Sequence, residues 1–419
     1  MYQHPSQLRI ANVHRTFRML LARGASSRAE LARLNGLSPV TAGKVVEGML
    51  EAGWIEEVES RGEGRPAIQD PGRMSSGSEE SAAMGRPPRL VGLSSTIRFP
   101  VVEIGTQQTS VRTISLAEAA AADFDVPTHH GATFVRFPTP RSVAGFLSHL
   151  GRARDALGIG SSRAVLVSVP GVLGSDGREI VFSPNLRWTN GRELIERIEG
   201  LFAARVCAVQ EIQALALGLL ASGDGGQAGG TLGPSPDSFV LVDFGDGVGG
   251  AVVTGGQLLH GPQPLCGEIG HTGVYGNRRR CGCGAVGCLE TLVSCRGVLQ
   301  SFRTRWRKPK ATWSDCARHI AAHGVEPWLA PSIDAAGTVI AGALNLVGAA
   351  DLVLTGDLPS LHPEVLVAFE RRVREHALVG RFARLTCHLA PRRRMLGLVA
   401  AAAGRILLPE PSLPVAEAS

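Results

Sequence analysis

Four residues near the middle of the chain have the types and spacing of a metal site. Cys281, Cys283 and Cys288 form the pattern C-x-C-x4-C, and His271 stands ten residues before the first of them. Three thiolates and one imidazole suit Zn2+ and complete a tetrahedral shell. Because four protein ligands leave no open position for water, the sequence predicts a structural zinc. A metalloenzyme is the weakest alternative, and an exchangeable water on the metal would revive it.

The residues around this cluster carry a second set of expectations. Three thiolates with one Zn2+ leave one net negative charge. The run Arg278, Arg279 and Arg280 either offsets this charge or forms a solvated basic loop. The other cysteines have no ligand spacing and are predicted to be ordinary small buried residues: Cys207, Cys266, Cys295, Cys316 and Cys387.

The first 65 residues have the pattern of a DNA-binding domain. Apolar residues and capping signals predict three helices, over 7–24, 27–36 and 38–53. The second begins with a Ser-x-x-Glu capping box, the third begins with Ser-Pro, and both end at glycine. The strand-like segment WIEEVES follows at 54–60. Residues 1–65 are therefore predicted to form a winged helix-turn-helix, the alternative being a helical bundle that makes only dimer contacts.

The third helix of such a domain enters the major groove, with its N-terminal residues facing the base edges. The predicted DNA contacts there are Ser38, Pro39, Val40, Thr41 and Lys44. The polar side chains of Thr41 and Lys44 suit base edges, and the apolar ones suit thymine methyl groups. Arg65 and Arg86 each stand in a Gly-Arg-Pro sequence, where a stiffened arginine suits a narrow minor groove and a solvated turn is the alternative.

Length and composition set the frame for these sites. The 419 residues predict two to four structural units, and the net charge of +6 permits a nucleic-acid partner without demonstrating one. The N-terminus lacks the apolar core of a signal peptide. The longest apolar run, MLGLVAAAAGRILL, is too short to cross a bilayer. A cytoplasmic protein with no membrane partner is expected.

The remainder of the chain changes character twice. Residues 66–95 are rich in Ser and Gly and are predicted to be an extended wing or linker. From Arg98 onward, FPVVEIG, RAVLVSVPG, SFVLVDFG and ADLVLTG are short apolar runs that end in glycine and alternate with helical stretches. Such turns place ligand loops at the ends of strands in an α/β fold. Residues 409–419 are predicted to be a disordered tail.

GEIGH followed by C-G-C-G-x-x-G-C-x-E, over residues 267–290, resembles the signature of the ROK family of sugar kinases and sugar-responsive repressors. The resemblance continues in residues 168–188 and 241–261, and in the N-terminal residues 27–57, which mark the repressor branch. It implies an α/β, two-lobed actin-like ATPase (ribonuclease H-like) sugar kinase fold, preceded by the winged helix-turn-helix. The implied lobe 1 spans 96–212 with a C-terminal helix near 391–408, and the implied lobe 2 spans 213–390.

The resemblance also implies a sugar pocket. The residues that match the family's sugar contacts are Asn185, Gln210, Glu211, Glu268, His271 and Glu290. Carboxylates suit this role because they accept hydrogen bonds from neighbouring hydroxyl groups. Since His271 would serve both metal and sugar, the zinc is expected to organise the pocket.

Three kinase motifs of the family are altered in this chain. The first phosphate loop, D-I-G-G-T, is replaced by E-I-G-T-Q at 103–107. Asp246 takes the threonine position of the second phosphate loop, where a carboxylate near a phosphate costs about 4 kcal/mol at an effective dielectric of about 20. Glu211 takes the position of the catalytic aspartate, and a shift of about 1 Å there costs about a hundredfold in rate. No working catalytic residue is expected, nor ATP and Mg2+ as cofactors.

The sequence therefore predicts a sugar-responsive transcriptional repressor that binds a double-stranded DNA operator as a homodimer or a dimer of dimers. The effector is expected to be a small sugar or sugar phosphate, whose binding closes the two lobes and changes the spacing of the recognition helices. One alternative is a ROK-type ATP-dependent sugar kinase with a DNA-binding appendage. The other is a constitutive DNA-binding or scaffold protein that binds no sugar.

Overall fold

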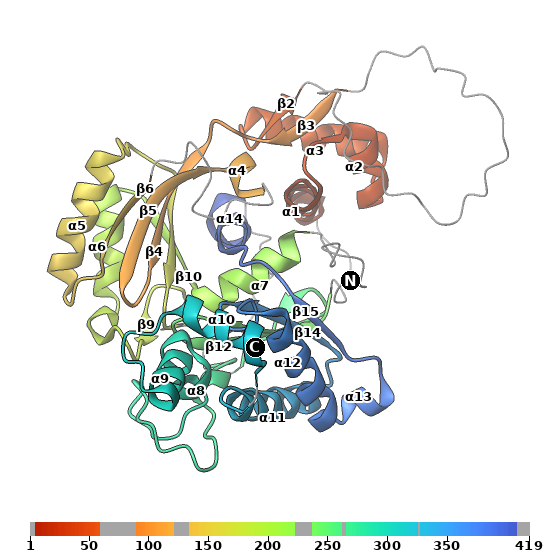
Figure 1. Ribbon diagram of the computed structural model, residues 1–419. Coiled ribbons are helices and arrows are strands. Elements are labelled where there is room, and N and C mark those ends of the chain that lie inside the picture. Colours follow the sequence, from red (N-terminus) through yellow and green to blue (C-terminus); the bar gives the residue numbers. More distant parts are fainter. Residues whose placement is uncertain are drawn as a thin grey trace, which may run out of the picture. The chain divides into compact units, whose positions relative to one another are not determined.

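The computed structural model describes residues 5–58, 89–120, 134–222, 237–261, 265–325 and 327–408 (Figure 1). These residues form two compact units, which divide between Ile97 and Arg98. Arg65, Arg86, most of the predicted linker and all of the predicted tail lie outside the described residues.

Unit 1, which ends at Ile97, is a small helical domain with a short sheet. Its described elements are α1 (Pro5–Arg23), β1 (Ser26–Ser27), α2 (Arg28–Asn35), α3 (Pro39–Glu51), β2 (Ile55–Val58) and β3 (Leu90–Leu93). The strand order is β1-β3-β2, and both pairs are antiparallel. Phe17, Leu20, Leu31, Val46 and Met49 are buried between the three helices. The three helices thus lie where the sequence predicts them, and β2 with β3 forms a hairpin after α3.

Local signals at the ends of α2 and α3 act as expected. The side chain of Ser27 accepts a hydrogen bond from the Glu30 backbone N–H at 3.1 Å, which is one of the two bonds of the predicted capping box. The side chain of Ser38 accepts from the Thr41 backbone N–H at 3.2 Å. Gly53, in the left-handed region at φ 73°, lets the chain turn from α3 into β2.

Unit 2 begins at Arg98 and contains two five-stranded sheets built on the same plan. The strand orders are β10-β7-β4-β5-β6 and β15-β14-β11-β12-β13. In each sheet three consecutive strands pair antiparallel and two more add in parallel. We refer to the part built on the first sheet as lobe 1 and to the part built on the second as lobe 2.

Lobe 1 contains β4 (Arg98–Ile104), β5 (Gln108–Ser115), α4 (Leu116–Ala120), β6 (Phe134–Pro138), α5 (Val143–Ala156), β7 (Ala164–Val169), β8 (Val172–Leu173), β9 (Ile180–Phe182), η1 (Arg187–Thr189), α6 (Glu193–Phe202) and β10 (Arg205–Gln210). Its core lies between the sheet and helices α5 and α6.

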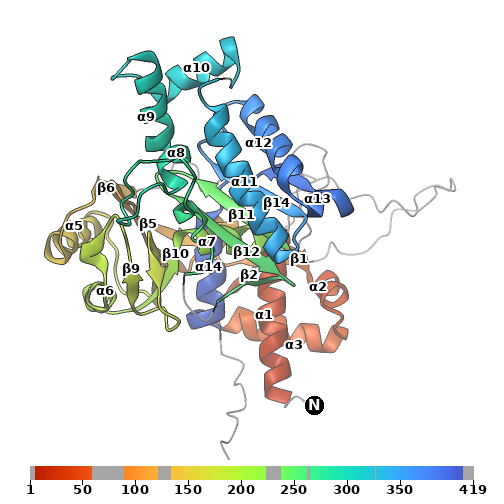
Figure 2. The ribbon, with the colours of Figure 1, turned by 90° about the horizontal axis from the view of Figure 1, so that it is seen from below.

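Lobe 2 contains β11 (Phe239–Phe244), β12 (Val248–Thr254), β13 (Gln257–Leu258), η2 (Ile269–His271), α8 (Glu290–Val293), α9 (Cys295–Trp306), α10 (Trp313–His323), α11 (Ala330–Val347), β14 (Asp351–Gly356), α12 (Pro363–His376), α13 (Val379–Phe382) and β15 (Thr386–Leu389). A larger core joins its sheet to helices α9 to α12. Figure 2 shows these helices gathered on one side of β11 and β14.

Two helices, α7 (Glu211–Ala221) and α14 (Arg394–Ala402), pack against each other between the lobes, and the π-helical turn η3 (Ala403–Leu407) follows α14 (Figure 1). They approach closely because glycine stands at the contact. A Cβ on Gly397 would lie 1.7 Å from the carbonyl oxygen of Ala214, and one on Gly218 would lie 2.0 Å from that of Arg393. Because α14 contacts β7, β10 and α4 of lobe 1, the segment that leads from β15 into α14 crosses from lobe 2 to lobe 1.

The four predicted glycine-ended runs are β4, β7, β11 and β14, all of them mostly buried. They are four of the six inner strands of the two sheets, and inner strands covered on both faces have continuous apolar sequences. The β4–β5 and β11–β12 turns meet, because the hydroxyl of Thr106 donates to Asp246 at 3.3 Å. The strand ends of both lobes thus surround one site.

Helix α11 adds a feature that the sequence analysis passed over. By length and composition it is the one helix in the described part of the chain that could span a membrane. Its Ile333, Ala336, Ile340 and Leu344 are buried in the core of lobe 2. It therefore packs as a core helix of this unit.

Candidate metal centre and sugar pocket

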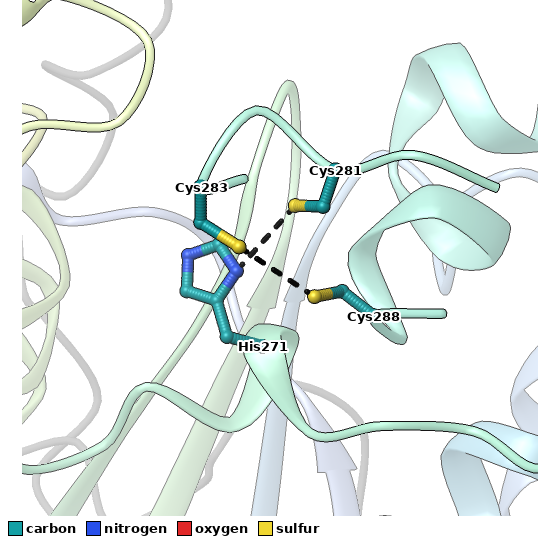
Figure 3. A group of neighbouring side chains, drawn as sticks. All are labelled: His271, Cys281, Cys283 and Cys288. Atoms are coloured by element: carbon teal, nitrogen blue, oxygen red, sulfur yellow. Dashed lines mark hydrogen bonds between the residues drawn. The ribbon is translucent and has the colours of Figure 1, made fainter. Parts of the chain in front are cut away.

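The four predicted metal ligands lie together in one loop of lobe 2. Their ligand atoms all fall within 4.8 Å of one another, and Figure 3 shows the three sulfurs and the imidazole of His271 turned toward a common centre. The Cys281 sulfur lies 3.6 Å from Nδ1 of His271, and the Cys283 sulfur lies 3.7 Å from that of Cys288. A tetrahedral zinc at its usual bond lengths would require about 3.6 Å and about 3.8 Å for these two edges. The donor set and its spacing fit a metal ion of this kind.

Backbone pairing holds this loop closed. Gly273 pairs with Cys288 and Arg280 with Val286 as isolated antiparallel bridges. Gly287, at φ 91°, could not carry a side chain, because a Cβ there would lie 2.8 Å from the carbonyl oxygen of Asn277. These contacts bring residues ten or more positions apart in the sequence to the same centre.

The arginine triplet divides: Arg278 and Arg280 are exposed, as in the solvated basic loop, whereas Arg279 differs from both expectations. Arg279 donates to the carbonyl oxygens of Thr291 and Gly297, at 2.7 and 3.1 Å, and to the hydroxyl of Ser301 at 2.9 Å. It therefore joins the metal loop to α9, and it neither faces the cluster nor lies free in solvent.

The remaining cysteines also need a correction. Cys207 and Cys316 are buried as predicted, whereas Cys266, Cys295 and Cys387 are only partly buried. Cys266 lies in the loop between β13 and η2, Cys295 begins α9, and Cys387 lies on β15, an edge strand of its sheet. Burial raises the pKa of Cys295 and of Cys387 to about 12, so both remain neutral thiols at pH 7.

All six residues matched to sugar contacts line one cavity of about 390 Å³ between the lobes. They are Asn185, Gln210, Glu211, Glu268, His271 and Glu290. The Gln210 amide donates to Glu268 at 3.1 Å, and Nε2 of His271 lies 3.7 Å from the other oxygen of Glu268. His271 therefore directs one ring nitrogen to the cysteines and the other to the cavity.

Two carboxylates of the cavity, Glu268 and Glu290, have few hydrogen-bond partners among the described residues. Burial raises the pKa of Glu268, against the opposing effect of His271. Glu290 begins α8 and accepts a hydrogen bond from the backbone N–H of Val248 at 3.1 Å. That bond ties the metal loop to the β11–β12 turn.

Two arginines that also line the cavity, Arg392 and Arg394, were not predicted from the sequence. Arg392 donates to Asp243 from Nε at 2.7 Å and from Nη2 at 3.1 Å, and to Asp357 at 3.2 Å. Arg394 donates to Glu103 at 3.0 Å and forms a second ion pair with Glu211. The run PRRRM at 391–395 was the available signal, because consecutive cations at the start of a helix are unusual.

Glu103 is surrounded by cations. Burial alone would raise its pKa, but Arg394 and Arg112 outweigh that effect and hold the pKa below its usual value. Because the folded-state pKa is the lower one, these ion pairs stabilise the fold at neutral pH. The contribution is lost as the pH falls through the folded-state pKa of Glu103.

In unit 1 the predicted DNA contacts gather at the start of α3. Ser38, Pro39, Val40 and Lys44 are exposed, and Thr41 is partly exposed. Val40 has 70% of its surface exposed, which is high for an apolar side chain and leaves it free for a partner. The hydroxyl groups of Ser38 and Thr41 bond each other at 2.8 Å, and both keep capacity for a further hydrogen bond.

Comparison with known proteins gives one family match, one similar regulator and two similar solved structures. Residues 141–408 match the model of the ROK family. The DNA-binding transcriptional dual regulator NagC of Escherichia coli (strain K12) is 23% identical over 379 residues, which are 86% of this chain and 84% of that protein.

Two solved structures agree with the predicted fold. A ROK family transcriptional regulator, a homologue of the E. coli MLC protein, has a TM-score of 0.67 at 18% identity and covers 94% of this chain and 96% of its own. A ROK family glucokinase from Streptomyces griseus, in complex with glucose and AMPPNP, has a TM-score of 0.57 at 19% identity and covers 73% of this chain and 98% of its own. The two-lobed actin-like sugar kinase fold is thereby confirmed. The regulators match a larger share of this chain than the glucokinase does.

Proposed function

Because this chain belongs to the ROK family, we propose that it is a cytoplasmic, sugar-responsive transcriptional repressor with a structural zinc and an inactive kinase site. One observation carries the proposal: all six sugar-contact residues line the cavity, while arginines pair with the carboxylates of Asp243 and Glu211 in the same cavity. The match with the regulator NagC over 86% of the chain supports it.

The sugar end of the cavity supports a sensor. Glu268, Glu290 and Asn185 line it together, and carboxylates accept the hydroxyl hydrogen bonds that a small sugar offers. Cavities of a few hundred Å3 are typical of small-ligand sites. The expected effector is a small sugar or sugar phosphate.

The phosphate end supports the loss of kinase activity. A magnesium–nucleotide complex needs free carboxylates for the metal and free donors for the phosphates. Here Arg392 already neutralises Asp243, and Arg394 already neutralises Glu211 at the position of the catalytic acid. Asp246 adds a carboxylate where the phosphates would lie. Glu211 would therefore have to leave an ion pair before it could act as a base.

The metal centre supports a structural role. Three sulfurs and one nitrogen would complete the shell of a zinc ion and leave no position for water. Glu268, next to the outer nitrogen of His271, is placed to orient the imidazole, as carboxylates beside metal-bound histidines do. When bound, the zinc would hold the loop that carries His271 and Glu290.

The cavity between two lobes offers a route from sugar to DNA. Ligand contacts with both Gln210 in lobe 1 and Glu268 in lobe 2 would favour a closed arrangement. In a homodimer or a dimer of dimers, closure would change the spacing of two recognition helices, which must match half-sites about one helical turn apart.

The test is a selection of genomic DNA fragments by the purified, zinc-loaded, full-length protein at physiological salt. Enrichment of a two-fold-symmetric site supports a regulator, and the neighbouring genes nominate the sugar. Lack of enrichment above non-specific background would overturn it. ATP-dependent phosphorylation of a free sugar, not improved by Asp246→Thr, would instead establish a kinase with a DNA-binding appendage.

Lys44→Ala is expected to weaken binding to the selected site by about tenfold or more, because a base contact contributes about 1–3 kcal/mol. Fluorescence anisotropy with the selected and a scrambled duplex measures the effect. Arg18→Ala, which removes an exposed cation from α1, is the matched control. An equal loss in both variants, or on both duplexes, would contradict a base contact by Lys44.

Glu268→Gln is expected to weaken sugar binding by about 10- to 100-fold, since a hydrogen bond to a charged group contributes about 1.5–3 kcal/mol. The thermal shift of the full-length protein with a panel of hexoses, pentoses and their phosphates measures it. Glu196→Gln, an exposed change on α6, should keep the wild-type response. If no member of the panel shifts the wild type, the protein is a constitutive DNA binder or scaffold.

A further inference from the structure

The hairpin of helices α9 and α10 carries a positive charge that neither the cavity nor the metal centre uses. Residues 295–323 contain seven of the 43 lysines and arginines of the chain and one of its 37 acidic residues. The rest of the chain is therefore charge-balanced. The whole net charge of +6 resides in this hairpin.

Most of these cations are free to meet a partner. Arg303 is committed, because it donates twice to the carbonyl oxygen of Ala311, and Arg318 pairs with Asp315. The guanidinium carbon of Arg305 lies 5.1 Å from the centroid of the Trp306 ring. The other four are exposed and form no ion pair within the described part of the chain: Arg296, Arg307, Lys308 and Lys310.

The cations follow one face of α9 and continue into the turn after it. Arg296, Arg303 and Arg307 recur at helical spacing and line a shallow hollow of about 960 Å³, in which Asp246 is the one acidic residue. Figure 2 shows α9 and α10 at the outer edge of lobe 2. The charges thus form an accessible strip and are not confined to a single socket.

We propose that this basic hairpin, residues 295–323, binds the phosphate backbone of duplex DNA without sequence preference. Duplex DNA carries one charge per roughly 1.7 Å, so it offers a line of phosphates to a line of cations. The 12 residues of α9 extend over about 18 Å. Unpaired arginines and lysines can bind there without first breaking an ion pair. Because DNA is the partner in the proposed function, the proposal rests on that function in this one respect.

The triple variant Arg296→Gln, Lys308→Gln, Lys310→Gln tests this surface in the full-length protein. Its affinity for a random-sequence duplex of about 30 base pairs is measured by fluorescence anisotropy over a series of salt concentrations. Each phosphate contact makes the slope of log K against log salt steeper by about 0.9, so the steepness of the slope should decrease by about 2.7. Affinity at low salt should fall at least about tenfold.

The matched control is Arg371→Gln, Arg381→Gln, Arg384→Gln, which removes three exposed charges from the region of α12 and α13. It should keep the wild-type slope. Equal slopes for the two triple variants would overturn the proposal and leave the winged helix as the DNA reader. A less steep salt dependence in the hairpin variant, together with unchanged specific binding by Lys44→Ala, would support DNA binding by the hairpin. It would overturn the role of the winged helix as the DNA reader. No duplex binding by the wild type would overturn both.

Discussion

Replacing Arg392 with methionine is expected to destabilise unit 2 by about 3 kcal/mol, the low end of the range for a buried ion pair that loses one partner. Its guanidinium forms a two-point contact with Asp243, whose side chain is only 12% exposed. In the variant, the hydroxyl of Thr355 would be the one remaining partner of Asp243 among the described side chains. The low end applies because Arg392 itself is 29% exposed.

Calorimetry of the full-length protein measures the effect. For a unit of this size, about 3 kcal/mol corresponds to a fall in Tm of roughly 5–10 °C. Arg192→Met is the control, because Arg192 and Asp176 form an exposed pair, with 48% and 41% of their side chains accessible. Such solvent-exposed pairs contribute little to stability, because water and salt screen them. If the Tm of Arg392→Met is as close to the wild-type Tm as the Tm of Arg192→Met is, the Arg392 pair does not stabilise the fold.

The pair also closes space at the second phosphate turn. A Cβ added to Gly245 would lie 2.6 Å from Nη2 of Arg392, and one added to Gly356 would lie 2.7 Å from it. The guanidinium thus packs directly against both glycines. The proposed loss of kinase activity therefore has a steric component in addition to the electrostatic one.

The elements that the sequence predicted well are those with local signals. The ends of α2 and α3 depend on Ser27, Ser38 and Gly53, which bond or turn within a few residues of their own position. The grouping of His271 with Cys281, Cys283 and Cys288 could be predicted because cysteine spacing within a short loop constrains its geometry. The inner strands could be predicted because a strand buried on both faces must be apolar throughout.

The arginine contacts could not be predicted from spacing. Arg392 and Asp243 are 149 residues apart, and Arg394 and Glu103 are 291 apart. They meet only because α14 packs between the lobes, which is a property of the tertiary fold. Likewise, nothing in the sequence around Arg279 indicates that its partners are the backbone of α8 and α9.

The charge of the α9–α10 hairpin was visible in the sequence and was nevertheless missed. A net charge of +6 over 419 residues is mild, and a whole-chain value conceals a local excess. What the structure adds is which of these cations lack a partner, since Arg303 and Arg318 have one. The charge composition of each segment and the ion pairs of its side chains together identify this surface. Neither observation identifies it alone.

Cys288→Ser is expected to reduce bound zinc from about one per chain to near zero, because a neutral hydroxyl replaces a thiolate in a closed four-ligand shell. None of the four cluster residues belongs to the core of either lobe, so the loss of structure should concentrate in the loop that contains the cluster. That loop carries its own reporter: Arg278 and Arg280 are exposed trypsin sites within it. Cleavage there should accelerate by about tenfold or more once the loop opens.

Metal analysis and a time course of limited trypsin digestion measure these two effects, with Cys266→Ser as the control, since Cys266 is outside the cluster. The displaced loop would carry His271 and Glu290 away from the cavity, so Cys288→Ser should also lose the sugar response. Operator binding should persist, because unit 1 contributes no ligand to the cluster and is a separate compact unit. A variant that keeps its zinc and its resistance to trypsin would show that Cys288 is not a ligand. One that loses zinc but keeps the sugar response would show that the metal does not organise the pocket.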